Sequence, residues 1–329
     1  MRLTLLTVAC VAVLTTAAAA EFRPAVVYDL GGRADGSFNE AAFIGAERFA
    51  AETGVAYRDF EIQNDAQREQ ALRRFARDGF DPVVAIGFSH ANALERVAAD
   101  FPDTRFAIVD MVVDQPNVRS ILFKEHEGSY LVGILAAMAA GEADVGFVGG
   151  MDIPLIRKFA CGYVGGAKSV RDDITVFQNM TGTTGAAWND PTRGGELARS
   201  QIDRGAAVVY HAAGGTGRGV LQAAADAGAL GIGVDSNQNH LHPGQVLTSM
   251  LKRVDVAVFN TFMDAMNDAF EPGVEVLGLA EDGVGWALDE HNAHLITDEM
   301  TAAVEAASAA IIAGDIVVHD YMSDGSCPY

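Results

Sequence analysis

Positive charge, cysteine and long apolar runs are all scarce in this sequence of 329 residues. There are 23 Lys and Arg residues against 44 Asp and Glu residues, which gives a formal net charge of -21. A surface this acidic repels phosphate backbones and anionic lipid, so binding to nucleic acid or to a membrane surface is not expected. No stretch after the N-terminus reaches the roughly 18 uninterrupted apolar residues of a membrane span. With 50% hydrophobic residues, the sequence has ample material for the core of a globular protein.

The usual signatures of catalytic and metal sites are also missing. No G-x-S-x-G motif of a nucleophilic serine is present. His240 and His242 are two positions apart rather than four, and no third ligand stands near them, so a zinc site is not supported. The glycine-rich run 214–219 fails the dinucleotide pattern, because Val220 stands where the last glycine is required. We therefore expect no enzyme activity, no cofactor and no bound metal.

The N-terminus has the features of an export signal. Arg2 is followed by an apolar run over 3–16 and then by four alanines, 17–20, which suit cleavage before Glu21. Cys10 lies inside the apolar run, well before the alanines, so it is not placed like the lipid-modified cysteine of a lipoprotein. A buried N-terminal helix is the alternative. The pattern predicts a signal peptide over residues 1–20 and a soluble, periplasmic mature protein.

Two cysteines remain after this signal, Cys161 and Cys327. In an oxidising compartment an even pair favours a disulfide, which would tie the C-terminal tail to the body of the protein. The alternative is two unpaired thiols, with Cys161 packed in the core as a small apolar side chain.

Short apolar runs alternate with helical patterns along the whole chain. This alternation is typical of βαβ units, and it predicts an α/β fold with parallel sheets flanked by helices. Strands are expected at 25–28, 83–86, 106–109, 145–148, 208–210 and 232–234.

An internal repeat indicates two such units. Val83 and Asp110 are 27 positions apart, and so are Val208 and Asp235, with a helical pattern between them in both cases. Each aspartate ends a predicted strand, and open α/β sheets bind ligands beyond the carboxyl ends of their strands. Two facing lobes would therefore place Asp110 and Asp235 on opposite walls of a cleft. Coincidence of spacing is the alternative.

A second candidate region joins the first strand to the first helix. Asp29 ends the strand, and Phe38 and Asn39 lie in the first turn of the helix, so an aromatic ring and two hydrogen-bonding side chains converge. Equally, Asp35 or Ser37 could simply cap this helix, with Phe38 in the core.

Three further residues are candidates for ligand contact. Trp188 lies in the polar loop 182–191, where it could stack on a flat ligand or anchor the loop to the surface. Gly214 would let the backbone approach a ligand closely. Lys252 is expected on a helix that follows the loop 235–238, either near the aspartate as a ligand-binding cation or solvated.

Six ordered motifs, spread over the chain after the signal, resemble the basic membrane protein family, most closely its purine nucleoside receptor branch. They are DGSFN at 35–39, GFSH at 87–90, IVD at 108–110, EGSYLVG at 127–133, FVGGMDIPLIRKF at 147–159, and GVDSNQ through LTSMLKRVDVAV at 233–258. Members of this family are bilobed solute-binding components of ABC importers. The resemblance implies a type I periplasmic binding protein fold, with two α/β lobes joined by hinge crossovers.

The resemblance also implies roles for single residues. Phe38 and Trp188 would stack on opposite faces of a purine base, although the family often has phenylalanine at the second position. Asp110 would accept hydrogen bonds from the base edge, while Asp235 and Lys252 would hold the ribose hydroxyls. The remaining positions that would complete the wall are Asp29, Asn39, Ser89 and Gly214.

The implied organisation is an N-terminal lobe of 21–123 plus about 251–279, and a C-terminal lobe of 124–250 plus about 280–329. The expected partners are a purine nucleoside and an ABC permease in the inner membrane, with the receptor itself a monomer. Two alternatives are a nucleoside hydrolase and a sensory receptor that presents its ligand. The hydrolase would need clustered aspartates near the N-terminus, where only Asp29 and Asp35 occur.

Overall fold

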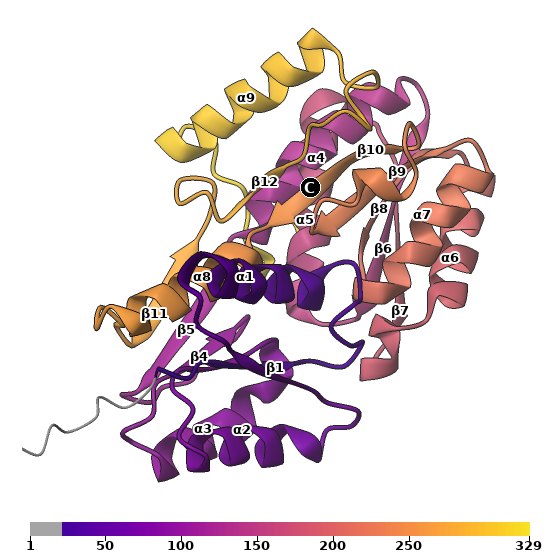
Figure 1. Cartoon of the computed structure of the whole chain (residues 1–329). Helices are drawn as coiled ribbons and strands as arrows, with labels where there is room; N and C mark the ends of the chain where they lie inside the picture. The colour runs from indigo at the N-terminus through magenta and orange to yellow at the C-terminus, as the bar shows by residue number, and fades with distance from the viewer. Residues whose placement is uncertain (1–21) are drawn as a thin grey trace, which may run out of the picture.

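A computed structural model describes residues 22–329, which form two α/β lobes (Figure 1). The predicted signal peptide, residues 1–20, lies outside the described residues. None of the helices within 22–329 is long and apolar enough to cross a membrane. The α/β class with two parallel-sheet lobes, predicted from the alternating pattern, is confirmed.

The first lobe is built on a sheet of six parallel strands in the order β11-β5-β4-β3-β1-β2. The strands are β1 (Ala25–Tyr28), β2 (Arg58–Glu61), β3 (Val83–Ala85), β4 (Phe106–Val109), β5 (Val118–Phe123) and β11 (Gly273–Leu277). The helices are α1 (Phe38–Thr53), α2 (Gln67–Arg77), α3 (Ala91–Asp100) and α8 (Val254–Met266). Helices α1 and α8 cover one face and α2 and α3 the other, as Figure 1 shows. Because both faces are covered, β1, β3 and β4 are entirely buried and entirely apolar.

The second lobe repeats this plan with the strand order β12-β10-β9-β8-β6-β7. The strands are β6 (Asp144–Met151), β7 (Val176–Gly182), β8 (Ala206–Ala212), β9 (Leu230–Asp235), β10 (Val246–Lys252) and β12 (Val284–Trp286). The helices are α4 (Glu125–Ala140), α5 (Pro154–Val170), α6 (Pro191–Asp203), α7 (Gly217–Asp226) and α9 (Asp298–Ala313). Only the edge strand β12 departs from the plan, because it runs antiparallel to β10. The pair β8 and β9 thus stands where β3 and β4 stand in the first lobe, as the internal repeat predicts.

The chain passes between the lobes at three places, which follow β5, β10 and β11. Backbone bonds tie these crossovers together: the Lys124 N–H donates to Leu277 O, and the Arg253 N–H donates to Gly283 O, both at 2.9 Å. Three adjacent crossovers allow the lobes to rotate about one line while each sheet stays intact.

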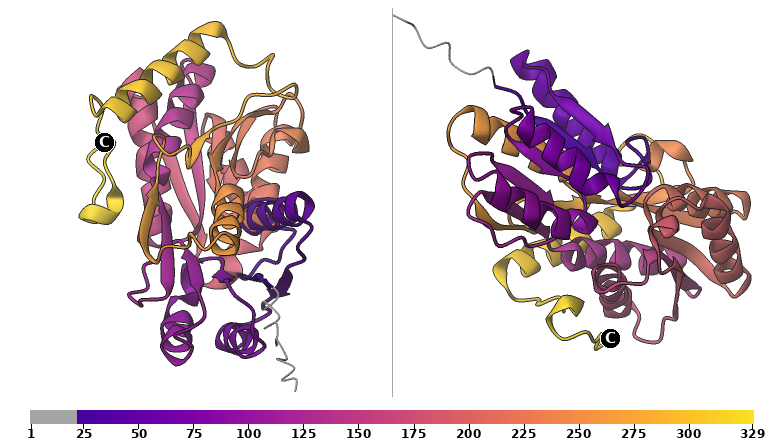
Figure 2. Two further views of the ribbon diagram at one scale, coloured as in Figure 1. Left: turned by 60° about the vertical axis from the view of Figure 1, so that its left-hand side comes forward. Right: turned by 90° about the horizontal axis from the view of Figure 1, so that it is seen from below.

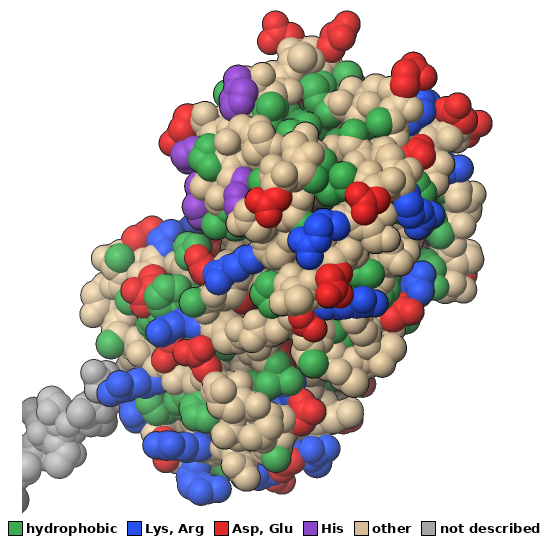
Figure 3. All heavy atoms as spheres, turned by 90° about the vertical axis from the view of Figure 1, so that its right-hand side faces the viewer, with side chains coloured by type: hydrophobic (Ala, Val, Ile, Leu, Met, Phe, Trp, Pro, Cys, Tyr) green, Lys and Arg blue, Asp and Glu red, His purple; other side chains and the backbone are tan. Residues whose placement is uncertain are grey.

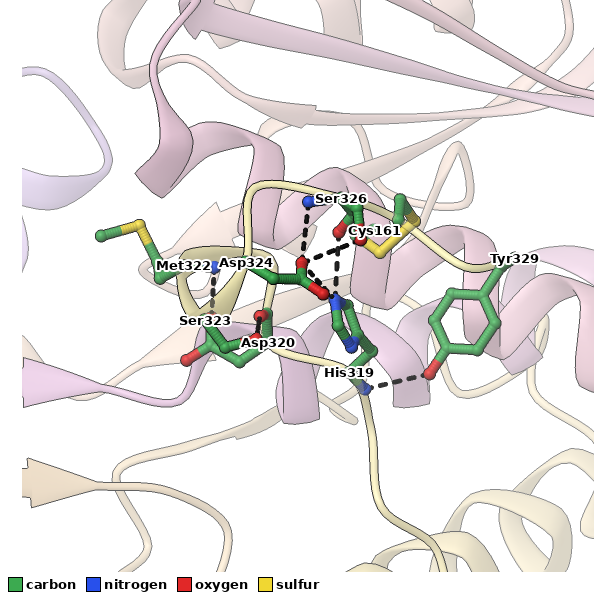
Figure 4. The surroundings of a disulfide bond; sticks show 9 residues. Cys161, His319, Asp320, Met322, Ser323, Asp324, Ser326 and Tyr329 are labelled. Atoms are coloured by element: carbon green, nitrogen blue, oxygen red, sulfur yellow. Dashed lines mark hydrogen bonds and ion pairs between the residues drawn. A yellow bond between two sulfur atoms is a disulfide. The ribbon is translucent and has the colours of Figure 1, made fainter.

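The C-terminal tail lies along the outer side of the second lobe (Figure 2). Cys327 in this tail forms a disulfide with Cys161 of α5 (Figure 4), so the predicted disulfide is confirmed. The surface in Figure 3 carries basic side chains at the base of the first lobe and acidic side chains over the top of the second.

Candidate functional site

The candidate site is a cavity between the lobes with about 590 Å³ of empty space, part of it open to solvent. It lies beyond the carboxyl ends of β1, β4, β9 and β10, where parallel sheets bind their ligands. Eight of the nine predicted ligand residues line it: Asp29, Phe38, Asn39, Asp110, Trp188, Gly214, Asp235 and Lys252. The ninth, Ser89, lines an adjoining surface groove, whose walls include Asp29 and Trp188.

Asp110 and Asp235 occupy equivalent positions in the two lobes. Each stands at the carboxyl end of the fourth strand of its lobe, β4 or β9, and each has a positive φ, 72° and 62°. Aspartate is among the few residues with a side chain that tolerate this left-handed conformation. The chain turns sharply at both points, and both carboxylates line the cavity.

Lys252 lies elsewhere than the sequence suggested. We expected it on a helix, but it is the last residue of β10, at the point where the chain crosses to the first lobe. The strand β10 includes the polar residues Thr248 and Ser249, so its sequence carries no unbroken apolar run that would mark it as a buried strand. The Lys252 side chain is 2% exposed, and its Nζ lies 2.7 Å from Asp110 Oδ1 and 2.9 Å from Glu125 Oε1.

The contacts of Lys252 with Asp110 and Glu125 affect the pKa values of these groups. Burial alone would lower the pKa of Lys252, but the Asp110 and Glu125 carboxylates raise it above its ordinary range, so the ammonium keeps its proton. Burial raises the pKa of Asp110, and Glu125 adds to this effect while Lys252 opposes it. Burial also raises the pKa of Asp235, to about 6. The cavity is therefore lined by the fixed cation of Lys252 and by buried carboxylates, Asp110 and Asp235 among them, that are costly to ionise.

The two aromatic candidates come from different lobes. Phe38 is the first residue of α1, half-buried, with Lys252 Nζ 5.0 Å from the centre of its ring. Trp188 ends a short 3₁₀ turn, Gly185–Trp188, and is also half-buried. Its indole packs directly on Gly150, where a Cβ would collide with the ring. Both rings pack against the hydrophobic core and also line the cavity.

Asp29 and Asn39 stabilise the wall of the cavity that the first lobe contributes. The Asp29 N–H donates to Asn39 Oδ1 at 3.0 Å, and Arg68 Nη1 lies 2.6 Å from Asp29 Oδ1. Burial raises the pKa of Asp29, and Arg68 opposes this. Since its carboxylate is already paired, Asp29 mainly fixes the shape of the wall.

Asp35 turns out to cap α1. Its carboxylate accepts the backbone N–H groups of Ser37, Asn39 and Glu40, whereas the Ser37 side chain makes no capping bond. The Ser37 hydroxyl instead donates to Asp235 Oδ2 of the other lobe at 2.6 Å.

Residues 34–37, which we call the latch, join the lobes by further bonds. Ser236 Oγ donates to Ser37 O at 2.9 Å, Gln238 Nε2 to Gly36 O at 2.8 Å, and Arg218 Nη2 to Ala34 O at 2.8 Å. The structure is therefore a closed arrangement of the two lobes.

Sequence reasoning missed several residues of the site. Phe88, Leu155, Ile156 and Phe159 supply apolar lining, and Glu125 supports Lys252 from behind. The spacing of Leu155, Ile156 and Phe159 is that of one helix face, which could have suggested a buried surface but not a ligand. Nothing in the sequence marks Glu125, because its role depends on the meeting of α4 and β10.

Two similar α/β lobes, hinged by three crossovers and closed on a cavity lined from both sides, define a bilobed solute-binding protein. A family model described as "ABC transporter substrate-binding protein PnrA-like" matches residues 22–321, so the chain belongs to this basic membrane protein (Bmp) family. The resemblance read from the motifs is thereby confirmed.

Relatives and solved structures agree with this assignment. The chain is 33% identical to the ABC transporter nucleoside-binding protein BmpA of Lactococcus lactis, over 91% of this chain and 89% of that protein. It is 34% identical to an uncharacterized lipoprotein of Pyrococcus abyssi, over 84% and 71%. Among solved structures, an ABC transporter solute-binding protein of Aeropyrum pernix matches with a TM-score of 0.83 and 32% identity, over 91% and 94%.

Proposed function

We propose that this protein binds purine nucleosides of the guanosine, inosine and adenosine class in the interlobe cavity and delivers them to an ABC permease. The observation that carries the proposal is the meeting, in one cavity, of two half-buried aromatic rings with carboxylates from both lobes. The name of the lactococcal relative supports it. Solute binding in an ABC system is the common role of the family, and the ligand class is our addition.

Each part of a nucleoside has a counterpart in this site. Phe38 and Trp188 stack on the two faces of the base, and such stacking contributes about 1–3 kcal/mol per base. Asp110 accepts hydrogen bonds from the base edge with the lone pairs that Lys252 leaves free. Asp235, which accepts a hydrogen bond from the Ser37 hydroxyl in the closed protein, also accepts hydrogen bonds from the ribose. Lys252 completes the ribose contact while it holds Asp110.

Ligand binding then drives closure. A nucleoside between open lobes contacts both walls only when the lobes close, so its differential affinity favours the closed arrangement. Closure also forms the hydrogen bonds between the latch and the second lobe. The closed form would be the state that a permease recognises.

The same proposal covers the setting of the protein. We infer an exported, periplasmic receptor with a signal peptide over 1–20, monomeric when it docks on the permease. We infer lobes of 21–123 with about 251–279 and 124–250 with about 280–329, with β10 of the second lobe extending to Lys252. No chemistry on the ligand is required.

A thermal-shift screen of the mature protein against nucleosides, free bases, sugars and amino acids tests the ligand class. A ligand at 100 times its dissociation constant adds about 2.7 kcal/mol to stability. We expect stabilisation by inosine or guanosine but not by ribose or hypoxanthine. Stabilisation by sugars or amino acids alone would overturn the proposal. Recovery of unchanged inosine after long incubation, with no free ribose, distinguishes a receptor from a hydrolase.

The pair Trp188→Ala and Trp188→Phe tests the stacking role. The alanine variant removes one face of the stack and should weaken nucleoside binding by about fivefold to 150-fold, because one stack contributes about 1–3 kcal/mol. The phenylalanine variant keeps an aromatic face and should retain most of the affinity. Titration calorimetry measures both, and equal affinities of the alanine variant and the wild type would remove Trp188 from the site.

A further inference from the structure

A chain of alternating charges leads from the ligand cavity to the C-terminal tail. We call it the charge chain; its members, in order, are Asp110, Lys252, Glu125, Lys158 and Asp320. Lys252 Nζ lies 2.9 Å from Glu125 Oε1, Lys158 Nζ lies 3.0 Å from Glu125 Oε2, and Lys158 Nζ lies 3.7 Å from Asp320 Oδ2. Only the first two members line the cavity.

The inner members of the charge chain are buried, so solvent contributes little to compensating their charges. The side chains of Lys252, Glu125 and Lys158 are 2%, 1% and 9% exposed. A buried charge that loses one partner is strongly destabilised, so each member depends on its neighbours on both sides. Lys158 Nζ also donates to Phe123 O at 2.7 Å, at the start of the first crossover.

Helix packing prevents these charges from moving apart. Lys158 is on α5, and Glu125 begins α4. A Cβ at Gly162 would collide with His126 O, and one at Gly166 would collide with Tyr130 O, so the backbones of α4 and α5 are in direct contact. The same turns of α5 present Phe159 to the cavity. A displacement of α5 would therefore move cavity lining and charge chain together.

The tail holds the outer end of the charge chain. Asp320 Oδ1 accepts the Met322 N–H at 2.9 Å, which leaves Oδ2 to face Lys158. His319 Nε2 is bonded to Asp324 and Ser326 within the tail (Figure 4). The disulfide fixes the tail to Cys161, one helical turn beyond Lys158. The position of Asp320 thus depends on the disulfide.

We propose that Glu125, Lys158 and Asp320 are positioning residues for ligand binding, and that the Cys161–Cys327 disulfide fixes the last of them. This inference rests on the proposed nucleoside site. Lys158 compensates Glu125, and Asp320 holds Lys158 in its place, which lets Lys252 remain on Asp110 at the cavity wall. Without Lys158 in this place, Glu125 would draw Lys252 away from Asp110 and from the ligand.

The test compares Asp320→Asn with Asp320→Glu and with the matched control Asp324→Asn, whose carboxylate is also in the tail but does not reach Lys158. We expect Asp320→Asn to weaken inosine binding about twofold to fivefold, the range of a partly exposed ion pair. Asp320→Glu should restore affinity, and Asp324→Asn should leave it unchanged. Titration calorimetry gives the dissociation constants, and equal affinities of the two asparagine variants would overturn the proposal.

A double-mutant cycle tests the role of the disulfide. We expect Cys161→Ser with Cys327→Ser to weaken binding about as much as Asp320→Asn, and the combination to cause little further loss, because both act on one contact. A merely structural disulfide would lower the melting temperature and leave the two losses additive. Additive losses would overturn the assignment of the disulfide.

A ligand-free measurement separates this inference from the proposed function. If no nucleoside binds the wild type, the proposed function fails, and positioning is judged in the apo protein by ¹³C NMR titration of Asp110. Lys158→Gln should raise the pKa of Asp110, because Lys252 then turns from Asp110 to Glu125. The remaining charged neighbours of Asp110 are Glu125 and Asp235, and both raise its pKa. An unchanged titration would overturn the inference by itself.

Discussion

Asp110 and Asp235 end equivalent strands of the two lobes with the same backbone conformation, yet their partners differ in kind. Asp110 pairs with the Lys252 ammonium at 2.7 Å, beside a crossover. Asp235 accepts a hydrogen bond from the Ser37 hydroxyl of the opposite lobe at 2.6 Å. One carboxylate is held by a buried cation, and the other by a neutral group in the latch.

The difference separates a permanent part of the site from a conditional one. Because Lys252 stands where the chain crosses between the lobes, its pair with Asp110 lies near the hinge line. The bond between Ser37 and Asp235 belongs to the latch, which can form only when the lobes meet. A duplicated fold has thus given one aspartate a fixed charge partner and left the other available to ligand and closure.

The largest effect is expected from Lys252→Met, which removes the buried cation that pairs with Asp110. It leaves the buried Asp110 and Glu125 carboxylates without their shared partner, and breaking a buried pair in this way costs about 3–5 kcal/mol. We expect a lower midpoint in urea unfolding and no measurable nucleoside binding. Lys168→Met, on the same helix as Lys158 but near its end, is the control and should match the wild type in both measurements.

The stabilities of Asp235→Asn and Asp110→Asn should differ, because the two carboxylates have different partners. Burial makes ionised Asp235 costly, so its neutralisation should stabilise the protein by about 1–3 kcal/mol while it weakens nucleoside binding. Asp110→Asn should gain less stability, because it deprives buried Lys252 of a partner. Urea unfolding at pH 7 gives the free energies of unfolding of both variants. The prediction is contradicted if Asp110→Asn is the more stable of the two.

Between pH 7 and pH 5, the stability of the apo protein and its affinity for nucleosides should change in opposite directions. The pKa of Asp235 rises from its ordinary value of 3.8 to about 6, so the stability gained from its protonated form is complete below about pH 4 and lost as pH rises through 6. Glu125 keeps its charge in this window, because Lys252 and Lys158 outweigh its burial and lower its pKa to about 2. The apo protein should melt higher at pH 5 than at pH 7, while nucleoside affinity falls. Burial also raises the pKa of Asp110 to about 6, so Asp235→Asn should reduce both trends and leave the share that Asp110 contributes. Trends of wild-type size in that variant would assign them to groups other than Asp235.

The smallest effect is expected from Arg218→Ala, which removes one bond of the latch. The Arg218 side chain is 50% exposed, so its bond to Ala34 O contributes little, and affinity should fall about twofold to fivefold. Small-angle scattering should show a larger apo radius of gyration with an unchanged melting temperature. Arg193→Ala, which alters an exposed ion pair within α6, is the matched control and should leave both the affinity and the radius unchanged.

Much of this fold could be predicted because its strands are short, apolar and buried on both faces. The expected strands at 25–28 and 106–109 coincide with β1 and β4, and the repeat of Val83 and Asp110 in Val208 and Asp235 predicted the duplicated sheet. Such patterns are local, and burial of the strand imposes them directly on the sequence.

The partners of the site residues could not be predicted in this way. That Asp35 caps α1 while Ser37 reaches the other lobe depends on how the lobes close. That Lys252 joins Asp110 to Glu125 depends on three elements far apart in the sequence. Spacing selected the right residue types for the cavity, but contacts between elements decide what each residue does there.

The disulfide has a consequence for how the protein matures. Residues 22–329 contain only the cysteines at 161 and 327, so oxidative folding of this part has a single intramolecular product and needs no isomerase to correct it. The bond also joins the middle of the chain to its last few residues. A chain that enters an oxidising compartment N-terminus first can complete this covalent closure only once Cys327 has crossed, which makes the oxidised bond a mark of translocation at least that far.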